Sequence, residues 1–196
     1  MGKAVKDITQ FYHLTSLNNM ESIIRDGLLP RESLTTFEDV ADPKIIEKRN
    51  ELSLNNMIPF HFFIHNPFDG RVMKDNPDME FVYLCISRNY AKNHNWKILP
   101  RHPLACQKED LKDYDDGFNS IDWLTMEKRE YQYDYGRAVC MAEALSPTDI
   151  PIEDFLFINV RTQEAFTYVN SLLKKYNKSV RVSITENYFI KRVSKE

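Results

Sequence analysis

The segment FVYLCIS at residues 81–87 restricts the fold more than any other part of the chain. It is a continuous apolar run, bounded by Asp and Pro on one side and by Arg and Asn on the other. Such a run is typical of a buried β-strand. With 196 residues, the chain is long enough to enclose this strand in one substantial core, and its length favours a single domain over residues 1–196.

Further strand-like runs lie on both sides of this segment. Apolar or alternating stretches occupy residues 11–15, 57–64, 138–145, 154–160, 180–184 and 188–190. They are mixed with helical stretches, without the regular strand–helix alternation of a doubly wound sheet. We therefore expect an α+β fold whose core is a mainly antiparallel β-sheet with flanking helices.

The clearest helices are predicted from apolar spacing and from their start and stop signals. The first follows Ser16, which can cap it, and it ends at Gly27, after which Pro30 prevents its continuation. Its apolar face is formed by Leu17, Met20, Ile23 and Ile24. Two more helices are expected, near residues 43–50 and over residues 161–176.

Residues 101–136 differ in character from the rest of the chain. They contain five Lys or Arg against nine Asp or Glu, and they show little periodicity beyond a short helix expected near residues 121–124. This pattern predicts a long loop. Long loops inside compact domains are uncommon and are often functional.

Composition excludes several classes of function. The net charge of −3 does not fit a domain that is basic throughout, so any nucleic-acid contact requires a local site. Three scattered cysteines are too few for a zinc site or a disulfide framework. His61 and His65 lie too far apart on a strand to share a metal, and no metal is expected. The five glycines form neither a GxGxxG nor a P-loop pattern.

The hydropathy of the chain indicates no association with a membrane. No apolar run approaches the roughly 18–20 residues of a membrane span. The opening residues MGKAVKD contain no apolar segment of the kind found in secretory signals. A soluble, cytoplasmic protein is therefore expected.

Glu143 is the most informative single residue. It lies in AVCMAEALSP among apolar or small neighbours, and strand alternation places it on one face with Val139 and Met141. A carboxylate in such a position costs free energy unless it is paired or hydrogen-bonded. Two interpretations follow: an ion pair with Arg137 or Arg161, or a carboxylate in a cleft that holds a substrate group or stabilises a developing cation.

Two histidines also allow two interpretations each. His13, in FYHLT at the end of the first predicted strand, is either a hydrogen-bonded core residue or a ligand-binding residue. His102 opens the predicted long loop, and it is either a solvated loop residue or part of a site. Neither choice is decided by the spacing alone.

The order of these segments resembles the DarT family. The segments that carry the resemblance are FYHLTSLNNMESIIRDGLL, a polar helix with Arg49, MIPFHFF, a long loop with IDW, and RAVCMAE, which together span about residues 11–160. The resemblance implies an ADP-ribosyltransferase-like fold with a long substrate-binding loop. It also implies a toxin that transfers ADP-ribose from NAD to a base of single-stranded DNA, with thymidine favoured, and releases nicotinamide. A DarG-like macrodomain antitoxin is the implied partner.

The resemblance also implies roles for residues of the first half of the chain. His13, Leu14 and Thr15 match the segment that holds the nicotinamide end of NAD. Ser22 and Pro30 correspond to positions near the adenosine half.

Further roles are implied for the catalytic centre and the DNA contact. Arg49, with Lys48 as the neighbouring alternative, matches the catalytic arginine, which also contacts NAD. Glu143 matches the catalytic glutamate. His102 and Trp123 match positions that contact the substrate DNA in the loop 102–143.

Alternatives to this function remain. The same fold can direct the transfer to guanine, RNA or protein, and the chain can instead be a catalytically silent module that binds NAD or nucleic acid. The net charge of −4 over residues 101–136 opposes DNA contacts through basic side chains in that segment. Stacking of bases on Trp123, Tyr131, Tyr133 or Tyr135 would supply affinity of about 1–3 kcal/mol per base instead.

Overall fold

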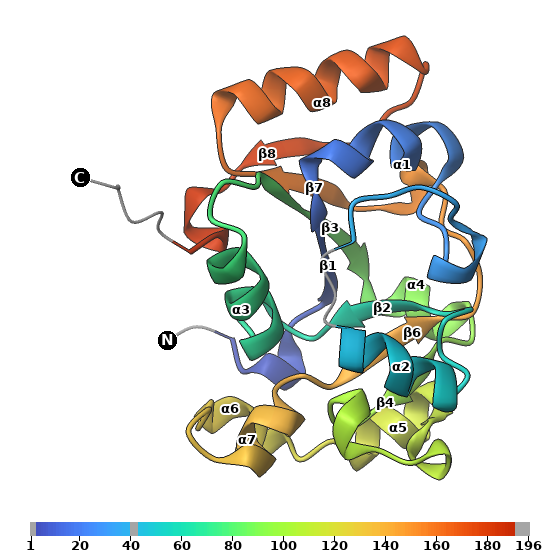
Figure 1. Cartoon of the computed structure of the whole chain (residues 1–196), viewed down its shortest axis with the longest axis vertical. Coiled ribbons are helices and arrows are strands. Elements are labelled where there is room, and N and C mark those ends of the chain that lie inside the picture. Colours follow the sequence, from blue (N-terminus) through green and yellow to red (C-terminus); the bar gives the residue numbers. More distant parts are fainter. Residues whose placement is uncertain (1–2, 40–42, 191–196) are drawn as a thin grey trace.

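A computed structural model describes residues 3–39 and 43–190 as a mixed β-sheet surrounded by short helices (Figure 1). The eight described strands have the spatial order β5-β4-β6-β2-β1-β3-β7-β8. Neighbouring strands are antiparallel except for β7 and β8, which are parallel. The predicted α+β class with a mainly antiparallel sheet is therefore confirmed. The strands are β1 (Gln10–Ser16), β2 (Ile58–His61), β3 (Phe81–Ser87), β4 (Lys97–Leu99), β5 (Lys112–Asp113), β6 (Glu143–Ser146), β7 (Phe157–Val160) and β8 (Val182–Ile184).

The helices gather at both ends of this sheet. Helices α1 and α8 lie next to each other beside β7 and β8, whereas α5 packs against β4 and β5 at the other end of the sheet, and α6 and α7 pack against each other (Figure 1). The helices are α1 (Met20–Asp26), α2 (Pro43–Glu51), α3 (Pro67–Asp75), α4 (Arg88–Asn93), α5 (Tyr114–Ser120), α6 (Trp123–Lys128), α7 (Asp134–Val139) and α8 (Gln163–Lys175). The three helices predicted near 17–26, 43–50 and 161–176 are thus confirmed.

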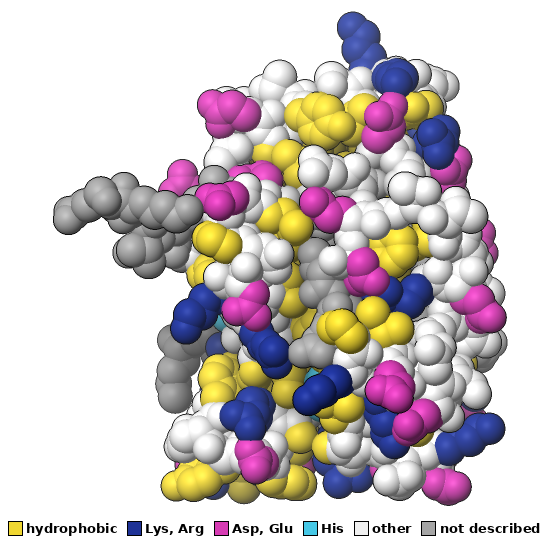
Figure 2. Space-filling view, viewed as in Figure 1, with side chains coloured by type: hydrophobic (Ala, Val, Ile, Leu, Met, Phe, Trp, Pro, Cys, Tyr) yellow, Lys and Arg dark blue, Asp and Glu magenta, His cyan; other side chains and the backbone are white. Residues whose placement is uncertain are grey.

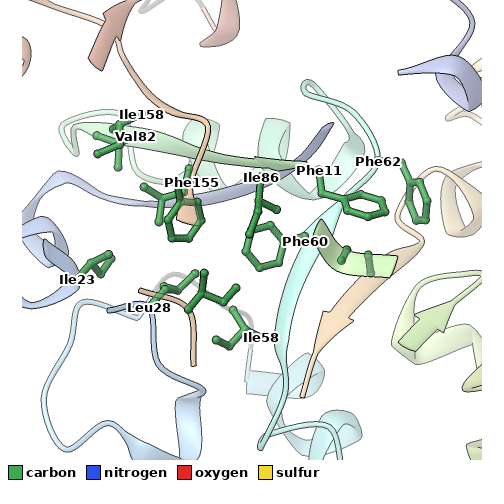
Figure 3. Close-up of a cluster of buried hydrophobic side chains, with 14 of the residues drawn as sticks. Phe11, Ile23, Leu28, Ile58, Phe60, Phe62, Val82, Ile86, Phe155 and Ile158 are labelled. Atoms are coloured by element: carbon green, nitrogen blue, oxygen red, sulfur yellow. The ribbon is translucent and has the colours of Figure 1, made fainter. Parts of the chain in front are cut away.

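Strand β3 is buried on both faces, which explains its continuous apolar sequence. Its even-numbered side chains join the larger hydrophobic cluster, together with Ile23 of α1 and Val169 of α8. Its odd-numbered apolar side chains join a second cluster with Val72 and Met73 of α3. Figure 3 shows the larger cluster, in which side chains from distant segments point toward one another beneath β3.

Three of the predicted strands are shorter than expected or absent. β2 ends at His61, and His65 adopts a left-handed backbone with φ 59°, so these two histidines do not share a strand. In the predicted strand 138–145, helix α7 continues to Val139 and β6 begins at Glu143. Residues 188–190 form no strand; a 3₁₀ turn ends at Tyr188. Periodicity does not distinguish a short buried helix from a strand, since both are continuously apolar.

The expected long loop over residues 101–136 is also wrong. The segment folds into 3₁₀ turns, β5 and the helices α5 and α6, and it runs into α7. It is held to the core by the buried side chains of Ile121 and Met126. The close approach of Gly117 to Ile98 adds a contact that leaves no room for a Cβ. Helices of six or seven residues are too short to display a helical period, so the sequence reads as a loop.

Gly27, where α1 ends, occupies a backbone conformation that only glycine adopts without strain. Its φ is 91°, and a Cβ at this position would lie 2.9 Å from the carbonyl oxygen of Ile150. Gly27→Ala is therefore expected to destabilise the fold by about 1–3 kcal/mol and to lower Tm by at least about 2 °C. Gly70→Ala in α3 is the matched control, because its Cβ would meet open space. Equal melting temperatures of the two variants would contradict the prediction.

Candidate active site

The sheet opens into a cavity between β1 and β2. β1 pairs with β3 along its whole length, from Gln10 to Ser16. Within the described ranges, β1 and β2 share a single residue pair, Tyr12 and His61. Pro59 of β2 has no N–H to donate to a neighbouring strand. Its carbonyl oxygen accepts a hydrogen bond from Nδ1 of the His13 side chain at 2.8 Å, so a side chain replaces the ladder at this point.

This cavity measures about 1220 Å³, counted out to its open mouth. It is lined by β1, α1, residues 27–39, α2, the start of β2, and by His102 and Glu143. Figure 2 shows this face, on which Lys and Arg side chains (dark blue) lie over α3 and near α2, with small traces of histidine (cyan) visible between the surrounding side chains. The cavity is open to solvent on one side, so a ligand can enter it.

A buried ion pair lies at the inner end of the cavity. Nη1 of Arg49 is 2.5 Å from Oε2 of Glu143, and each residue is only 5% exposed. Nη2 of Arg49 donates to the carbonyl oxygens of Leu54 at 3.1 Å and of Met57 at 3.3 Å. The guanidinium thus compensates the burial of the Glu143 carboxylate, which alone would cost several kcal/mol. The two groups place one positive and one negative charge in the same water-poor space.

This pair decides between the alternatives left by the sequence. The partner of Glu143 is neither Arg137, which pairs with Asp134, nor Arg161. Lys48 pairs with Glu51 and does not line the cavity. Arg49 is therefore the basic residue of α2 that reaches the site.

Three histidines surround the ion pair, and their hydrogen bonds define their tautomers. Nδ1 of His13 contacts the carbonyl oxygen of Pro59, and Nδ1 of His61 contacts that of Ala142 at 3.3 Å. A carbonyl only accepts, so both histidines carry a hydrogen on Nδ1 and, when neutral, a lone pair on Nε2. Nδ1 of His102 instead accepts from the backbone N–H of Leu104 at 3.3 Å, which places the hydrogen on Nε2.

Burial keeps two of these imidazoles neutral. Desolvation lowers the pKa of His13 to about 4, although its hydrogen bond to Pro59 acts in the opposite direction. Desolvation also lowers the pKa of His61, against the attraction of the Glu143 carboxylate. At neutral pH both side chains therefore offer an uncharged acceptor nitrogen. Sequence reasoning missed His61; the available signal was a polar residue within the apolar run MIPFHFF.

Most of the residues that are predicted to bind NAD lie in the cavity wall. Leu14, Thr15 and Ser22 line it, as does His13. The Ser22 hydroxyl donates to the carbonyl oxygen of Asn19 at 2.9 Å. Pro30 does not line the cavity; it precedes a 3₁₀ turn whose first residue does.

Residues 27–39 form a strap along the cavity, held to the start of α1 through Glu38. The backbone N–H of Glu38 donates to Oδ1 of Asn19 at 2.9 Å, and Nδ2 of Asn19 donates back to the Glu38 carbonyl at 3.1 Å. The Glu38 carboxylate accepts from the Ser16 hydroxyl and from Nδ2 of Asn18. These bonds position Phe37, whose ring the Arg31 guanidinium covers at 5.2 Å.

Trp123 is not part of the cavity wall. Its ring packs against Phe62 and Phe118, with centroid distances of 5.5 Å and 4.6 Å. Its Nε1 donates to the carbonyl oxygen of Phe118 at 3.0 Å. The structure therefore places the half-buried Trp123 ring against the hydrophobic core and outside the cavity lining, and its contact with DNA stays a prediction.

Metal-ligating side chains and cysteines are the other residues that could carry chemistry, and among the residues that the structure describes they form no site. In the described part of the chain, no three His, Cys, Asp or Glu side chains gather closely enough to hold a metal ion. The three cysteines are buried and unpaired, and burial raises the pKa of Cys106 and of Cys140 to about 11. Among residues 3–39 and 43–190, no helix has the length and apolar character needed to span a membrane.

Comparison with known proteins decides the family. A family model described as "ssDNA thymidine ADP-ribosyltransferase, DarT" matches residues 12–190. The chain belongs to the DarT family. The predicted family is confirmed, although no curated protein matches the sequence.

Solved structures of DarT proteins share the fold. Thermus sp. 2.9 DarT in complex with ADP-ribosylated ssDNA has a TM-score of 0.79 and 19% identity, over 97% of this chain and 100% of that chain. The same protein in complex with NAD+ has a TM-score of 0.73 and 18% identity, over 94% and 98%. Thermosipho africanus DarTG in complex with ADP-ribose has a TM-score of 0.70 and 20% identity, over 93% and 51%. This chain therefore has the ADP-ribosyltransferase fold of the DarT structures.

Proposed function

We propose that this chain transfers ADP-ribose from NAD to thymidine in single-stranded DNA and releases nicotinamide, with residues 1–196 acting as a single transferase domain. The observation that carries the proposal is the buried Arg49–Glu143 ion pair in the lining of the cavity between β1 and β2. Membership of a family described as ssDNA thymidine ADP-ribosyltransferases supports it. So do the structures of Thermus sp. 2.9 DarT, which was solved in complex with NAD+ and in complex with ADP-ribosylated ssDNA.

Glu143 is the proposed electrostatic catalyst. Breaking the bond between nicotinamide and ribose develops positive charge at the anomeric carbon of the ribose. A carboxylate already fixed in a water-poor site stabilises such a charge more strongly than water does, because it does not have to reorient. The Arg49 contact holds the carboxylate in place before the substrate arrives.

Arg49 and the cavity wall are proposed to bind NAD. The Arg49 guanidinium stays protonated in proteins, so it suits the pyrophosphate or negative charge that develops on the base. His13, Leu14 and Thr15 would then hold the nicotinamide end, and Ser22 would lie toward the adenosine. Pro30 would act indirectly, by directing the turn that follows it. No metal takes part in this scheme, and NAD is a co-substrate.

The base is proposed to enter past His102, which lines the cavity together with Glu143. The stacking role expected for Trp123 is not part of the proposal, because the ring lies against the core. Between His102 and Glu143, the segment 103–142 contributes no residue to the cavity lining; it folds into 3₁₀ turns, β5 and the helices α5, α6 and α7.

Trp123→Ala is accordingly expected to lower stability by about 3 kcal/mol, while the folded variant keeps its affinity for single-stranded DNA. Thermal denaturation and titration with a short single strand measure the two quantities. Leu124→Ala is the matched control, because Leu124 is 69% exposed on the same helix and its loss should leave Tm unchanged. A Trp123→Ala variant with normal stability and weakened DNA binding would restore the stacking role.

We also propose a cellular setting for the activity. As a toxin of this family, the protein would act in the cytoplasm and be opposed by a DarG-like macrodomain partner. The Thermosipho relative supports this, since it is a DarTG protein solved with ADP-ribose, and the present chain spans about half of it. Removal of the modification by a DarG-like macrodomain would test the pairing.

The alternative functions can be distinguished by which class of molecule receives labelled ADP-ribose. The protein is incubated with NAD labelled in its ADP-ribose part, separately with single-stranded DNA, RNA and protein extract. The proposal predicts label in the DNA only. Label in RNA or protein would indicate the alternative transferases, and tight NAD binding without any labelled pool would indicate a silent binding module.

A further inference from the structure

The proposed reaction needs a proton acceptor that the ion pair does not supply. In thymidine, N1 carries the deoxyribose, so N3 is the ring nitrogen that still bears a proton. A new bond from N3 to the ribose carbon requires loss of this proton. Arg49 stays protonated, and the Glu143 carboxylate is engaged by the guanidinium and by the developing cation. A neutral base within the same cavity would complete the chemistry.

His61 is the histidine that lies directly across the sheet from Glu143. It is the last residue of β2, and the two residues are partners in the β2–β6 ladder, so their side chains lie on the same face. His61 lines the cavity and is 7% exposed. The bond from Nδ1 to the Ala142 carbonyl and the Phe68 ring, 5.4 Å away between centroids, hold the imidazole in one orientation.

We propose that His61 is a further catalytic residue, whose Nε2 accepts the N3 proton of the thymine during transfer. This inference rests on the proposed function. The Nε2 lone pair takes the proton, and the N3 electron pair forms the bond to the anomeric carbon of the ribose. The bond from that carbon to nicotinamide breaks, and its electron pair leaves with nicotinamide, which departs uncharged. The imidazolium then returns the proton to solvent.

The charges around His61 suit this role. Glu143, from β6, favours the imidazolium that forms on proton uptake, whereas Arg49 from α2 and His102 oppose it. Burial is the largest effect and keeps the resting imidazole neutral, so its acceptor nitrogen is available at neutral pH. The Ala142 carbonyl plays the part of the group that orients a catalytic histidine through its other nitrogen.

The test compares two bases that differ in the acidity of N3. One short single strand contains one thymidine, and the other contains 5-bromo-2′-deoxyuridine, in which bromine replaces the methyl group at similar size and makes N3–H more acidic. His61→Gln removes the acceptor nitrogen. His61→Asn does so while its amide can still donate to the Ala142 carbonyl. His94→Gln is the matched control, because His94 is exposed on the surface beside α4.

With thymidine, single-turnover transfer by both His61 variants should fall at least about 100-fold, while His94→Gln keeps the wild-type rate. With bromouracil, the loss should shrink at least tenfold, because the base needs less help to release its proton. An equal loss with both bases, or retention of more than a tenth of the rate with thymidine, would overturn the role of His61. A wild-type protein that modifies neither strand would instead refute the proposed function. Should His61→Gln fail to fold, His61→Asn decides by the same comparison.

Discussion

Replacing Glu143 by glutamine is expected to slow transfer of ADP-ribose by about 10²–10³-fold, the usual effect of removing one preorganised electrostatic stabiliser. The substitution keeps the shape of the side chain and its ability to accept from Arg49, but it removes the negative charge that faces the developing cation. Transfer is measured under single-turnover conditions with a short thymidine-containing strand, so that product release does not hide the effect.

NAD binding separates this effect from simple loss of the site. Calorimetric titration should show NAD affinity in Glu143→Gln close to that of the wild type, because the carboxylate is proposed to act mainly on the charge that develops during bond cleavage. A variant that retains more than a tenth of the wild-type rate would remove Glu143 from the catalytic centre.

Replacing Arg49 by methionine is expected to destabilise the fold by about 3–5 kcal/mol, because it leaves the Glu143 carboxylate buried without its counter-ion. Methionine fills much of the same volume, so the loss reports the charge rather than a cavity. For a chain of this length, Tm should fall on the order of 10 °C. Transfer should be lost as well, since the guanidinium is proposed to bind NAD.

The double variant Arg49→Met with Glu143→Gln tests the cause of this loss. Without the carboxylate there is no unpaired charge to bury, so the double variant should be more stable than Arg49→Met alone. Additive losses from the two single variants would show that the ion pair contributes no coupling and that Arg49 acts through packing.

Features that depend on local sequence were predictable. The apolar run at 81–87 is a buried strand because its neighbours cover both faces, and Gly27 ends α1 at a left-handed residue, as its position in the sequence indicates. The DarT family was predictable from the order of five short segments, although no single segment carries it. Glu143 was predictable as a site residue because an isolated carboxylate in an apolar run needs a partner.

Features that depend on contacts between distant residues were not predictable. Arg49 and Glu143 are 94 positions apart. The sequence therefore favoured Arg137 and Arg161, which lie nearer along the chain, as partners of the Glu143 carboxylate. His61 becomes a candidate because it pairs with Glu143 across two strands, and Trp123 lies outside the cavity lining because its ring packs against Phe62 and Phe118.

Mass spectrometry of one modified strand tests directly whether this chain joins ADP-ribose to thymidine. A short single strand with one thymidine is incubated with NAD and the protein, beside the same strand with cytidine in that position and beside Glu143→Gln. The thymidine strand is expected to gain the mass of one ADP-ribosyl group on its thymidine, with nicotinamide released in equal amount. The cytidine strand should remain unmodified, and Glu143→Gln should form at most about a hundredth of the wild-type product in the same time. Equal modification of the cytidine strand, or nicotinamide release without any modified base, would contradict the proposed function.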